Sequence, residues 1–365
     1  MKAAVLYEFK TPLRVEDVDL GNPKEGEVRV KIVASGVCHS DYSVIHGVLG
    51  AKLPAVLGHE GAGIVDEVGP GVTLVKLGDH VVLSVIANCG YCSFCAIGQP
   101  VLCDNLGRTL GRGTMLDGTS RLSKNGHTIA QLAGLASFAQ YVVVPEMTCI
   151  PIPNHVPLDK ACLVGCGVMT GVGAAINTAK VEPGSSAVVI GCGGVGLNVI
   201  QGCALAGARI IIGVDLLDNK LDYAKEFGAT HTINPGRQDL LKTVRSLTNG
   251  RGADYAFEVI GLSKTLEQAY ACTHRGGTLI IVGAGSREDL WQIPVGSFLM
   301  TEKVIKSSTY GSSRPRMDLP RLIDLYMNKQ LKLDELVSRT YPLDDINQSM
   351  TALEKGEVAR SVILM

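Results

Sequence analysis

The sequence predicts an α/β protein in which a doubly wound parallel sheet is joined to a β-rich domain. The prediction depends on a change in the pattern of apolar and polar residues. Short alternating or apolar runs occupy the first part of the chain, and segments with strand and helix patterns alternate from about residue 181. The length of 365 residues adds a further observation, because one hydrophobic core rarely serves so long a chain. We therefore expect two domains with separate cores.

The β-rich domain is predicted from runs in which apolar and polar residues alternate or apolar residues cluster, bounded by Gly, Pro and Asp. Such runs are EVRVKIV, GAGIVDEVG and DHVVLSV. The parallel sheet is predicted from a repeated strand-helix order, since parallel strands are usually connected by helical crossovers. The successive segments are SSAVVIG, GLNVIQGCALAG, RIIIGVD, NKLDYAKEFGA, ADYAFEVI, KTLEQAYACT and GTLIIVG.

Composition favours a well-packed protein that binds small molecules. Hydrophobic residues make up 46% and charged residues 19%, and the formal net charge is -1, so no strong field attracts nucleic acid or an anionic membrane. The longest uncharged stretch, residues 183–208, contains seven glycines, which favours a buried strand, a turn and a helix over a membrane span. The N-terminal segment has no secretory signal, and we expect a cytoplasmic protein.

Four cysteines in NCGYCSFCAIGQPVLC have the spacing of a closed metal site. Four thiolates suit a tetrahedral zinc ion with complete coordination, so the ion would clamp a lobe at about residues 88–104 without binding substrate. An iron-sulfur cluster uses the same type of ligand, and ordinary thiols or a nucleic-acid-binding zinc module are further alternatives. The absence of an adjoining basic patch disfavours the nucleic-acid module. The four are Cys89, Cys92, Cys95 and Cys103.

A second group of candidate ligands leaves room for a substrate. Cys38 in GVCHSDYSV, His59 in LGHEGAGIV and Cys166 in LVGCGVMTGVG would give a zinc ion two thiolates and one imidazole, with the fourth position open. Zinc in such a site acts as a Lewis acid that lowers the pKa of an alcohol, which can then release hydride near neutral pH. Spacing alone does not connect Cys166 to Cys38, and a lone cysteine or histidine is more often a packing residue than a ligand.

Polar neighbours of these residues have candidate roles in the same chemistry. Asp41 can accept the second ring N–H of His59 and thereby fix the orientation of the imidazole. Ser40 can pass on the proton of the alcohol, and Glu60 can support the metal ligands without binding the metal ion itself. We therefore interpret Ser40, Asp41 and Glu60 as candidate catalytic residues.

The segment VVIGCGGVG predicts a dinucleotide site. Its glycines follow a predicted strand and open a predicted helix, the context in which a G-x-G-x-x-G turn holds a pyrophosphate at a helix N-terminus. The next strand ends at Asp215, whose carboxylate can accept ribose hydroxyls and would repel a 2′-phosphate, so NAD is favoured over NADP. Lys220 either covers the adenosine ribose or is a solvated helix residue. The turn residues are Gly191, Gly193, Gly194, Val195 and Gly196.

Taken together, these motifs resemble the medium-chain zinc alcohol dehydrogenases, and the resemblance covers essentially the whole chain. It implies a catalytic zinc on Cys38, His59 and Cys166, and a structural zinc on the four clustered cysteines. It also implies NAD at the glycine turn. The expected cofactors are therefore two zinc ions and one NAD per subunit.

The same resemblance implies domain boundaries and further cofactor contacts. A GroES-like catalytic domain would comprise residues 1–167 and 310–365, and a Rossmann domain would comprise residues 168–309. Thr170 would lie near the nicotinamide. The other implied contacts are His39 and Arg360 near the pyrophosphate, and Val259 and Val282 near the cofactor rings.

The segment RGTMLDGTSR resembles the long loop of the class I and glutathione-dependent formaldehyde dehydrogenase branches, and bacterial aryl or benzyl alcohol dehydrogenases share the general pattern. Ser43 stands where liver-type enzymes end their proton relay in a histidine, so the relay must shorten, use water or use another base such as His46. In the formaldehyde branch an arginine binds the carboxylates of glutathione adducts, and its position falls near Leu106 or Gly107 in this chain. The absence of arginine there disfavours that branch, although the neighbouring Arg108 is an alternative. The implied substrate pocket is apolar and includes Leu49, Val85 and Leu132.

We therefore expect reversible, NAD-linked oxidation of a primary alcohol, hydrophobic or aromatic, to its aldehyde. The alternatives are an S-(hydroxymethyl)thiol or formaldehyde dehydrogenase, a nicotinoprotein that retains its NAD, and a catalytically silent sensor that binds zinc and nucleotide. The resemblance also implies assembly, because members of that family form dimers or tetramers by joining Rossmann sheets edge to edge, and the segment VGSFLMTEKVIKS could supply that edge. The long loop accompanies dimeric relatives, so we expect a homodimer in preference to a tetramer. Neither nucleic acid nor a membrane is an expected partner.

Overall fold

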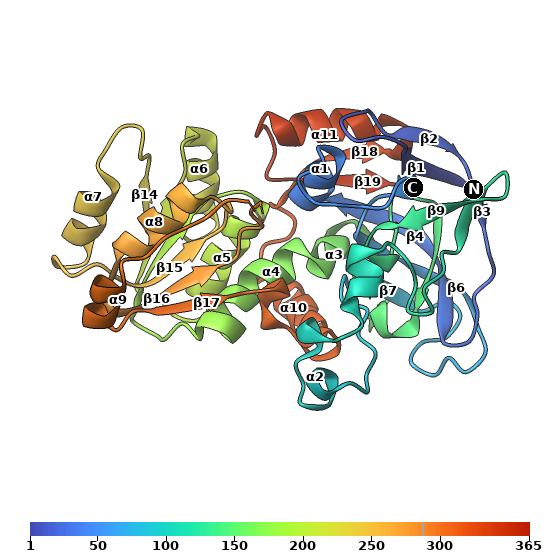
Figure 1. Ribbon diagram of the computed structural model, residues 1–365, viewed down its shortest axis with the longest axis horizontal. Helices are drawn as coiled ribbons and strands as arrows, with labels where there is room; N and C mark the ends of the chain where they lie inside the picture. The colour runs from blue at the N-terminus through green and yellow to red at the C-terminus, as the bar shows by residue number, and fades with distance from the viewer. Residues whose placement is uncertain (287) are drawn as a thin grey trace. The chain divides into compact units, whose positions relative to one another are not determined.

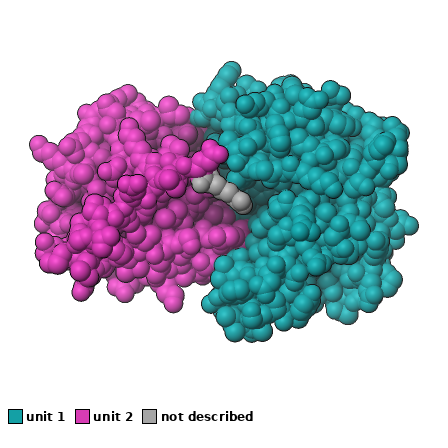
Figure 2. Space-filling model, in the orientation of Figure 1, with its two compact units in different colours: residues 1–166, 314–365 teal, residues 167–313 magenta. Residues whose placement is uncertain are grey.

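The computed structural model describes residues 1–286 and 288–365, and the chain forms two compact units, coloured separately in Figure 2. The first unit comprises residues 1–166 and 314–365, and the second comprises residues 167–313. Gly167 and residues 310–313 thus belong to the second unit, whereas the sequence predicted them in the first. The cause is local: in η7 (Tyr310–Ser312), Gly311 O accepts from Asn177 Nδ2 at 3.1 Å, and the Ser312 hydroxyl lies 2.7 Å from that of Thr178.

The first unit is β-rich, as the alternating runs predicted. One of its sheets has the order β2-β1-β5-β9-β8-β3, and another has the order β11-β7-β6-β4-β19-β18 with β10 paired to β4 (Figure 1). The strands are β1 (Lys2–Leu6), β2 (Arg14–Asp17), β3 (Asp19–Leu20), β4 (Glu27–Val37), β5 (Ala55–Val56), β6 (Glu60–Val68), β7 (His80–Leu83), β8 (Leu122–Lys124), β9 (His127–Gln131), β10 (Tyr141–Pro145), β11 (Cys149–Ile152), β18 (Val337–Pro342) and β19 (Arg360–Leu364). The helices are α1 (His39–Ile45), α2 (Ser93–Ala96), α3 (Leu158–Ala161), α10 (Pro315–Met327) and α11 (Ile346–Glu354).

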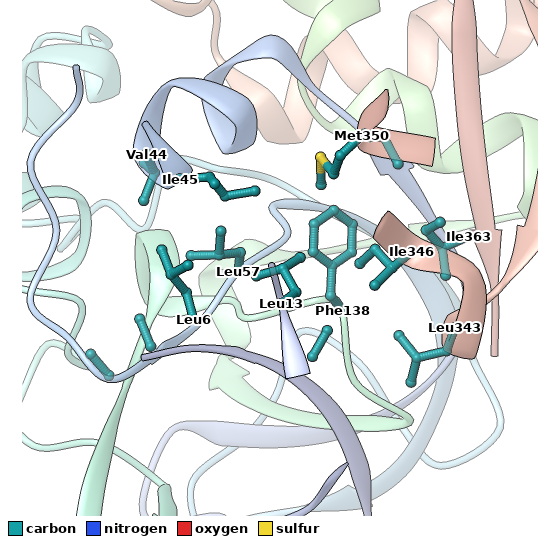
Figure 3. Close-up of a cluster of buried hydrophobic side chains, with 14 residues drawn as sticks. Leu6, Leu13, Val44, Ile45, Leu57, Phe138, Leu343, Ile346, Met350 and Ile363 are labelled. Atoms are coloured by element: carbon teal, nitrogen blue, oxygen red, sulfur yellow. The ribbon is translucent and has the colours of Figure 1, made fainter. Parts of the chain in front are cut away.

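The C-terminal segment completes the core of the first unit. Apolar residues of α11 recur at helical spacing, and Ile346 and Met350 point into a buried cluster with Leu57 and Phe138 (Figure 3). Ile363 joins the cluster from β19, which pairs with β4 in antiparallel register. Two segments far apart in sequence therefore share one hydrophobic core, which ties the end of the chain to the strands that carry the site.

The second unit is a doubly wound parallel sheet with the order β14-β13-β12-β15-β16-β17. Its central strands are buried along their whole length, as expected where helices cover both faces. Chain order reverses at β12, and α5 packs with α6 while α7 packs with α8. The elements are α4 (Gly167–Gly173), β12 (Ser186–Ile190), α5 (Gly194–Leu205), β13 (Ile210–Val214), α6 (Asp218–Glu226), β14 (His231–Ile233), α7 (Leu240–Leu247), β15 (Ala253–Glu258), α8 (Ser263–Cys272), β16 (Thr273–Ile281), α9 (Val295–Thr301) and β17 (Val304–Ser307).

Within the described residues, no single helix is both long enough and apolar enough to cross a membrane. One pair of shorter helical segments, Leu158–Gly165 and Gly167–Ala179, meets the length and composition criteria only when the two are taken together across a bend. The uncharged stretch at residues 183–208 forms β12, a glycine turn and α5, as the sequence predicted.

Candidate active site and metal centres

The open ligand group forms where three segments of the first unit converge. Cys38 follows β4 and precedes α1, His59 precedes β6, and β4 pairs with β6 so that Gly36 lies opposite Glu60. Cys166 follows the 3-10 turn η5 (Cys162–Gly165), which packs on β6 and β4. The donor atoms of Cys38, His59, Glu60 and Cys166 all lie within 4.8 Å of one another. The tertiary structure thus connects Cys166 to Cys38, which spacing alone could not do.

Asp41 anchors this group from behind. Its fully buried carboxylate accepts the ring Nδ1–H of His59 at 3.1 Å and the backbone N–H groups of Gly58 at 3.1 Å and Cys38 at 3.2 Å. Because Nδ1 carries the hydrogen atom that Asp41 accepts, Nε2 is the nitrogen of His59 that remains to bind a metal ion. Gly58 adopts φ +87°, and a Cβ there would lie 2.5 Å from the backbone nitrogen of Phe138, so this close turn requires glycine.

The two thiols and the imidazole shift one another's protonation. A hydrogen bond from Cys166 lowers the pKa of Cys38 well below its ordinary value, and the same contact together with burial raises the pKa of Cys166. Burial opposes protonation of His59, but the carboxylate of Asp41 and then Cys38 raise its pKa well above the usual range. Two sulfur donors and one nitrogen donor fit a zinc ion that keeps one position for a further ligand.

Glu60 and Arg360 form a buried ion pair beside the ligand group. Glu60 is fully buried, Arg360 is 4% exposed, and the guanidinium donates to the carboxylate. Burial raises the pKa of Glu60 to about 7, against the opposing charge of Arg360 and with a further upward contribution from Cys38. Arg360 is therefore engaged inside the first unit, and its proposed contact with a pyrophosphate stays a prediction.

The residues expected to move protons or to touch the cofactor lie in different surroundings. Ser40 is half-buried, with its hydroxyl oxygen 3.6 Å from Cys38 Sγ. His39 is exposed, and its Nδ1 lies 3.4 Å from the hydroxyl of Ser43. Thr170 is half-buried in α4 of the second unit. His46 packs its ring on Tyr42 on the same short helical segment as Ser43. The roles of these residues remain predictions.

The second cysteine cluster forms in a loop lobe around α2 and the turn η1 (Pro100–Leu102). The sulfur atoms of its four cysteines lie within 4.8 Å of one another. Backbone N–H groups point at the sulfurs, with Cys92 N 3.4 Å from Cys89 Sγ and Cys89 N 3.3 Å from Cys103 Sγ. The lobe leaves apolar side chains in solvent, with Tyr91 80% and Ile97 68% exposed. Four thiols in such a weakly packed lobe fit a closed structural zinc site.

The glycine turn has the form that a dinucleotide site requires. Gly191 adopts φ +99°, Gly193 caps α5, and a Cβ on Gly196 would lie 1.8 Å from Gly191 O. The carboxylate of Asp215 follows β13 and is held by the backbone N–H groups of Cys192 at 2.9 Å and Leu217 at 3.1 Å. A negative charge is thus fixed beside the turn where a ribose hydroxyl would bind.

The remaining predicted cofactor residues flank the same sheet edge. Val259 and Val282 follow β15 and β16, and both are half-buried. Gly194 and Val195 begin α5, and Lys220 is half-buried on α6. The positions agree with a ligand at the carboxyl ends of parallel strands, while the individual contacts remain predictions.

The predicted substrate-pocket residues are half-buried in the first unit. Leu49 and Leu132 pack against the hydrophobic cluster of Figure 3, and Val85 follows β7. Leu132 also lines a small cavity, whose other lining residues are Ala51, Lys52, Ala55, Leu110, Gly111, Gly113 and Ala130. The sequence motifs did not single out Glu258, a buried carboxylate within the predicted strand segment ADYAFEVI.

The chain is similar to known proteins along its full length. Residues 24–154 match the family described as alcohol dehydrogenase GroES-like domain, and residues 194–328 match zinc-binding dehydrogenase. An S-(hydroxymethyl)glutathione dehydrogenase of Paracoccus denitrificans is 44% identical over 373 residues, covering 100% of this chain and 99% of that protein.

Two solved structures share the fold across 100% of the chain. An alcohol dehydrogenase zinc-binding domain protein from Burkholderia ambifaria has a TM-score of 0.96 and 36% identity, with 98% of its chain covered. A benzyl alcohol dehydrogenase from Acinetobacter calcoaceticus has a TM-score of 0.95 and 34% identity, with 99% covered. Similarity of this extent confirms the fold class and the resemblance that the sequence motifs suggested.

Proposed function

Because the chain belongs to the zinc-dependent medium-chain alcohol dehydrogenase family, and is thus an oxidoreductase, we propose that it reversibly oxidises primary alcohols with hydrophobic or aromatic side chains to aldehydes, with NAD as hydride acceptor. The observation that carries the proposal is the three-donor group of Cys38, His59 and Cys166, braced by Asp41. Zinc held there supplies Lewis acidity that favours loss of the alcohol proton.

The chain's own residues divide the remaining work. Asp41 holds the imidazole of His59 in one tautomer and one orientation. The hydroxyl of Ser40 accepts the alcohol proton and passes it toward solvent, because it lies beside Cys38 and is half-buried. The carboxylate of Asp215 accepts ribose hydroxyls and repels a 2′-phosphate, which favours NAD over NADP.

The proposed substrate preference is supported by the apolar character of the three predicted pocket residues, Leu49, Val85 and Leu132. Apolar side chains in a binding pocket favour a hydrophobic or aromatic group on the alcohol and gain little from a small polar one. The benzyl alcohol dehydrogenase that shares the fold agrees with this preference.

The test is zinc content per chain, measured together with NAD reduction by benzyl alcohol and by ethanol. We expect two zinc ions, turnover with NAD, and a larger kcat/KM for benzyl alcohol than for ethanol. NAD that copurifies and does not exchange would identify a nicotinoprotein instead. Two zinc ions with no turnover across a broad panel of alcohols would favour the silent sensor.

A second candidate is oxidation of S-(hydroxymethyl)glutathione, which the name of the 44% identical relative favours. In this chain the guanidinium of Arg108, the nearest candidate for binding the glutathione carboxylates, donates to Leu116 O at 2.6 Å. We therefore expect kcat/KM for benzyl alcohol to exceed that for S-(hydroxymethyl)glutathione. The reverse order, with loss of the glutathione activity in Arg108→Ala, would replace the first candidate by the second.

The assembly is a proposal of the same kind. Apolar side chains of α9 stand in solvent, with Val295 83%, Leu299 74% and Met300 76% exposed, and β17 is the last strand of its sheet. We propose that this edge joins a second copy of the chain in a homodimer. Light scattering should give a dimer mass, and Leu299→Glu should shift it to the monomer.

A further inference from the structure

Glu258 is a buried carboxylate in the second unit that the assigned chemistry does not use. It ends β15 and is fully buried. Its Oε1 accepts from Ile260 N at 2.9 Å, from Gly261 N at 2.8 Å and from Thr265 Oγ1 at 2.7 Å. One oxygen therefore fixes the turn that follows the strand and ties it to the start of α8.

The turn fixed by Glu258 packs against two other loops of the nucleotide site. The backbone O of Glu258 accepts from Val282 N at 2.8 Å, and a Cβ added to Gly283 would lie only 2.2 Å from Gly261 N. A Cβ added to Gly191 would lie 2.8 Å from Ile260 Cγ1. Residues 259–261, residues 282–285 and the glycine turn are thus packed as one block, in which a small shift of one loop displaces the others.

The second carboxylate oxygen of Glu258 indicates that this residue does more than stabilise the turn at residues 259–261. Oε2 of Glu258 is buried and has no hydrogen-bond partner among the residues that the structure describes. Burying a carboxylate oxygen without a protein partner is unfavourable, so this oxygen does not contribute to the stability of the fold, and Glu258 calls for another explanation.

We propose that Glu258 is a positioning residue for the nicotinamide half of the dinucleotide, an inference that rests on the proposed use of NAD. The adenosine ribose is assigned to Asp215 at the end of β13, on one side of β12. The pyrophosphate is assigned to the turn after β12, so the other half of the cofactor extends toward the ends of β15 and β16. The two loops that Glu258 holds in register are the loops at those ends.

The test compares NADH binding by four variants with that of the wild-type enzyme. Glu258→Ala should raise the NADH Kd roughly tenfold, because Ile260, Gly261 and Thr265 lose their common acceptor and residues 282–285 pack on the turn that this acceptor fixes. Glu258→Gln should stay within about threefold of wild type, because its amide oxygen can still accept from the same three donors. Thr265→Val removes one of the donors and should raise the Kd by about threefold.

Asp254→Ala is the matched control. Asp254 lies at the other end of β15 and accepts from Ser186 N at 2.8 Å and from His274 Nε2 at 2.8 Å, so its loss disturbs the same strand away from the nucleotide loops. We expect it to lower Tm without changing the NADH Kd. Amide hydrogen exchange should accelerate at residues 260 and 261, which lose their acceptor, in Glu258→Ala and stay at the wild-type rate there in Asp254→Ala.

Two results would overturn the inference. One is an unchanged NADH Kd in Glu258→Ala; the other is an equal increase in Glu258→Ala and Asp254→Ala. If Glu258→Ala does not fold, Thr265→Val with wild-type Kd and wild-type exchange would also overturn it. Failure of wild-type enzyme to bind NADH would refute the proposed NAD chemistry itself, which distinguishes the two failures.

Discussion

The two groups of candidate metal ligands lie in the same unit but are built in opposite ways. The open group of Cys38, His59 and Cys166 joins segments far apart in sequence, and its supporting Asp41 is fully buried. The closed cluster at residues 89–103 lies in one short loop lobe whose apolar side chains are exposed. A site that must keep one coordination position open needs a rigid scaffold behind it, whereas a closed site organises its own surroundings.

The two groups also differ in the polar partners that surround their thiols. In the open group a buried carboxylate, an imidazole and an ion pair between Glu60 and Arg360 surround the two thiols. In the closed cluster the partners are mainly backbone N–H groups of the lobe. Changes in the open group should therefore affect catalysis first, and changes in the closed cluster should affect stability first.

The largest expected effect is the loss of turnover in Cys166→Ala. Removing one of three donors from an open site should lower zinc content from two to one per chain and kcat/KM by about a thousandfold or more, by analogy with loss of a main catalytic group. Zinc content and NAD reduction by benzyl alcohol measure both. Cys162→Ala is the control, because that buried thiol lies nearby and outside the ligand group. Equal loss in the two variants would remove Cys166 from the site.

A smaller effect is expected from Asp41→Asn. The amide keeps the shape but loses the charge that orients the imidazole of His59, so zinc affinity and kcat/KM should each fall about 10-fold to 100-fold. Competition with a chelator measures the affinity, and steady-state kinetics measures the rate. An unchanged affinity would show that the backbone around Gly58 alone holds His59 in place.

In the closed cluster, Cys103→Ser should change stability more than rate. We expect loss of one zinc ion and a fall in Tm of roughly 10 °C, since loss of a structural metal is among the largest single-site effects. The kcat per folded chain should stay within about threefold of wild type. Calorimetry and initial rates at low temperature test this, with Cys149→Ala as a buried-thiol control outside both clusters. A loss of rate with unchanged Tm would contradict the structural assignment.

The smallest effect is an order of thiol alkylation in enzyme stripped of metal. Burial opposes ionisation of Cys89, but backbone N–H groups of Tyr91 and Cys92 lower its pKa to about 6, whereas burial raises the pKa of Cys103 to about 12. Iodoacetamide at pH 7 should therefore modify Cys89 before Cys103, at a rate that levels off about one pH unit above the pKa of Cys89, while modification of Cys103 should still accelerate with pH. Peptide mass spectrometry gives the order, and labelling of Cys103 first would contradict it.

Local pattern was enough to predict the strands β12, β13, β15 and β16 and the helices α5, α6 and α8 of the second unit, but it did not predict α4, β14, α7, α9 or β17. Each strand and helix there is contiguous, and Gly191, Gly193 and Gly196 occupy a turn whose conformation excludes larger side chains. The burial of Glu258 could not be predicted in the same way. Its hydrogen-bond donors follow closely in the chain, but its burial depends on β12 and β16, which lie on either side of its strand. A single glutamate at the end of an apolar run gives no sign of being buried.

The sequence by itself determined the α/β class, the closed cysteine cluster and the glycine turn, because in each case the required residues are adjacent in the chain and their spacing carries the geometry. Only the tertiary structure brought Cys166 to Cys38, paired Glu60 with Arg360 and placed residues 310–313 in the second unit. These contacts depend on strand pairing and core packing between distant segments, and a linear pattern does not contain that information.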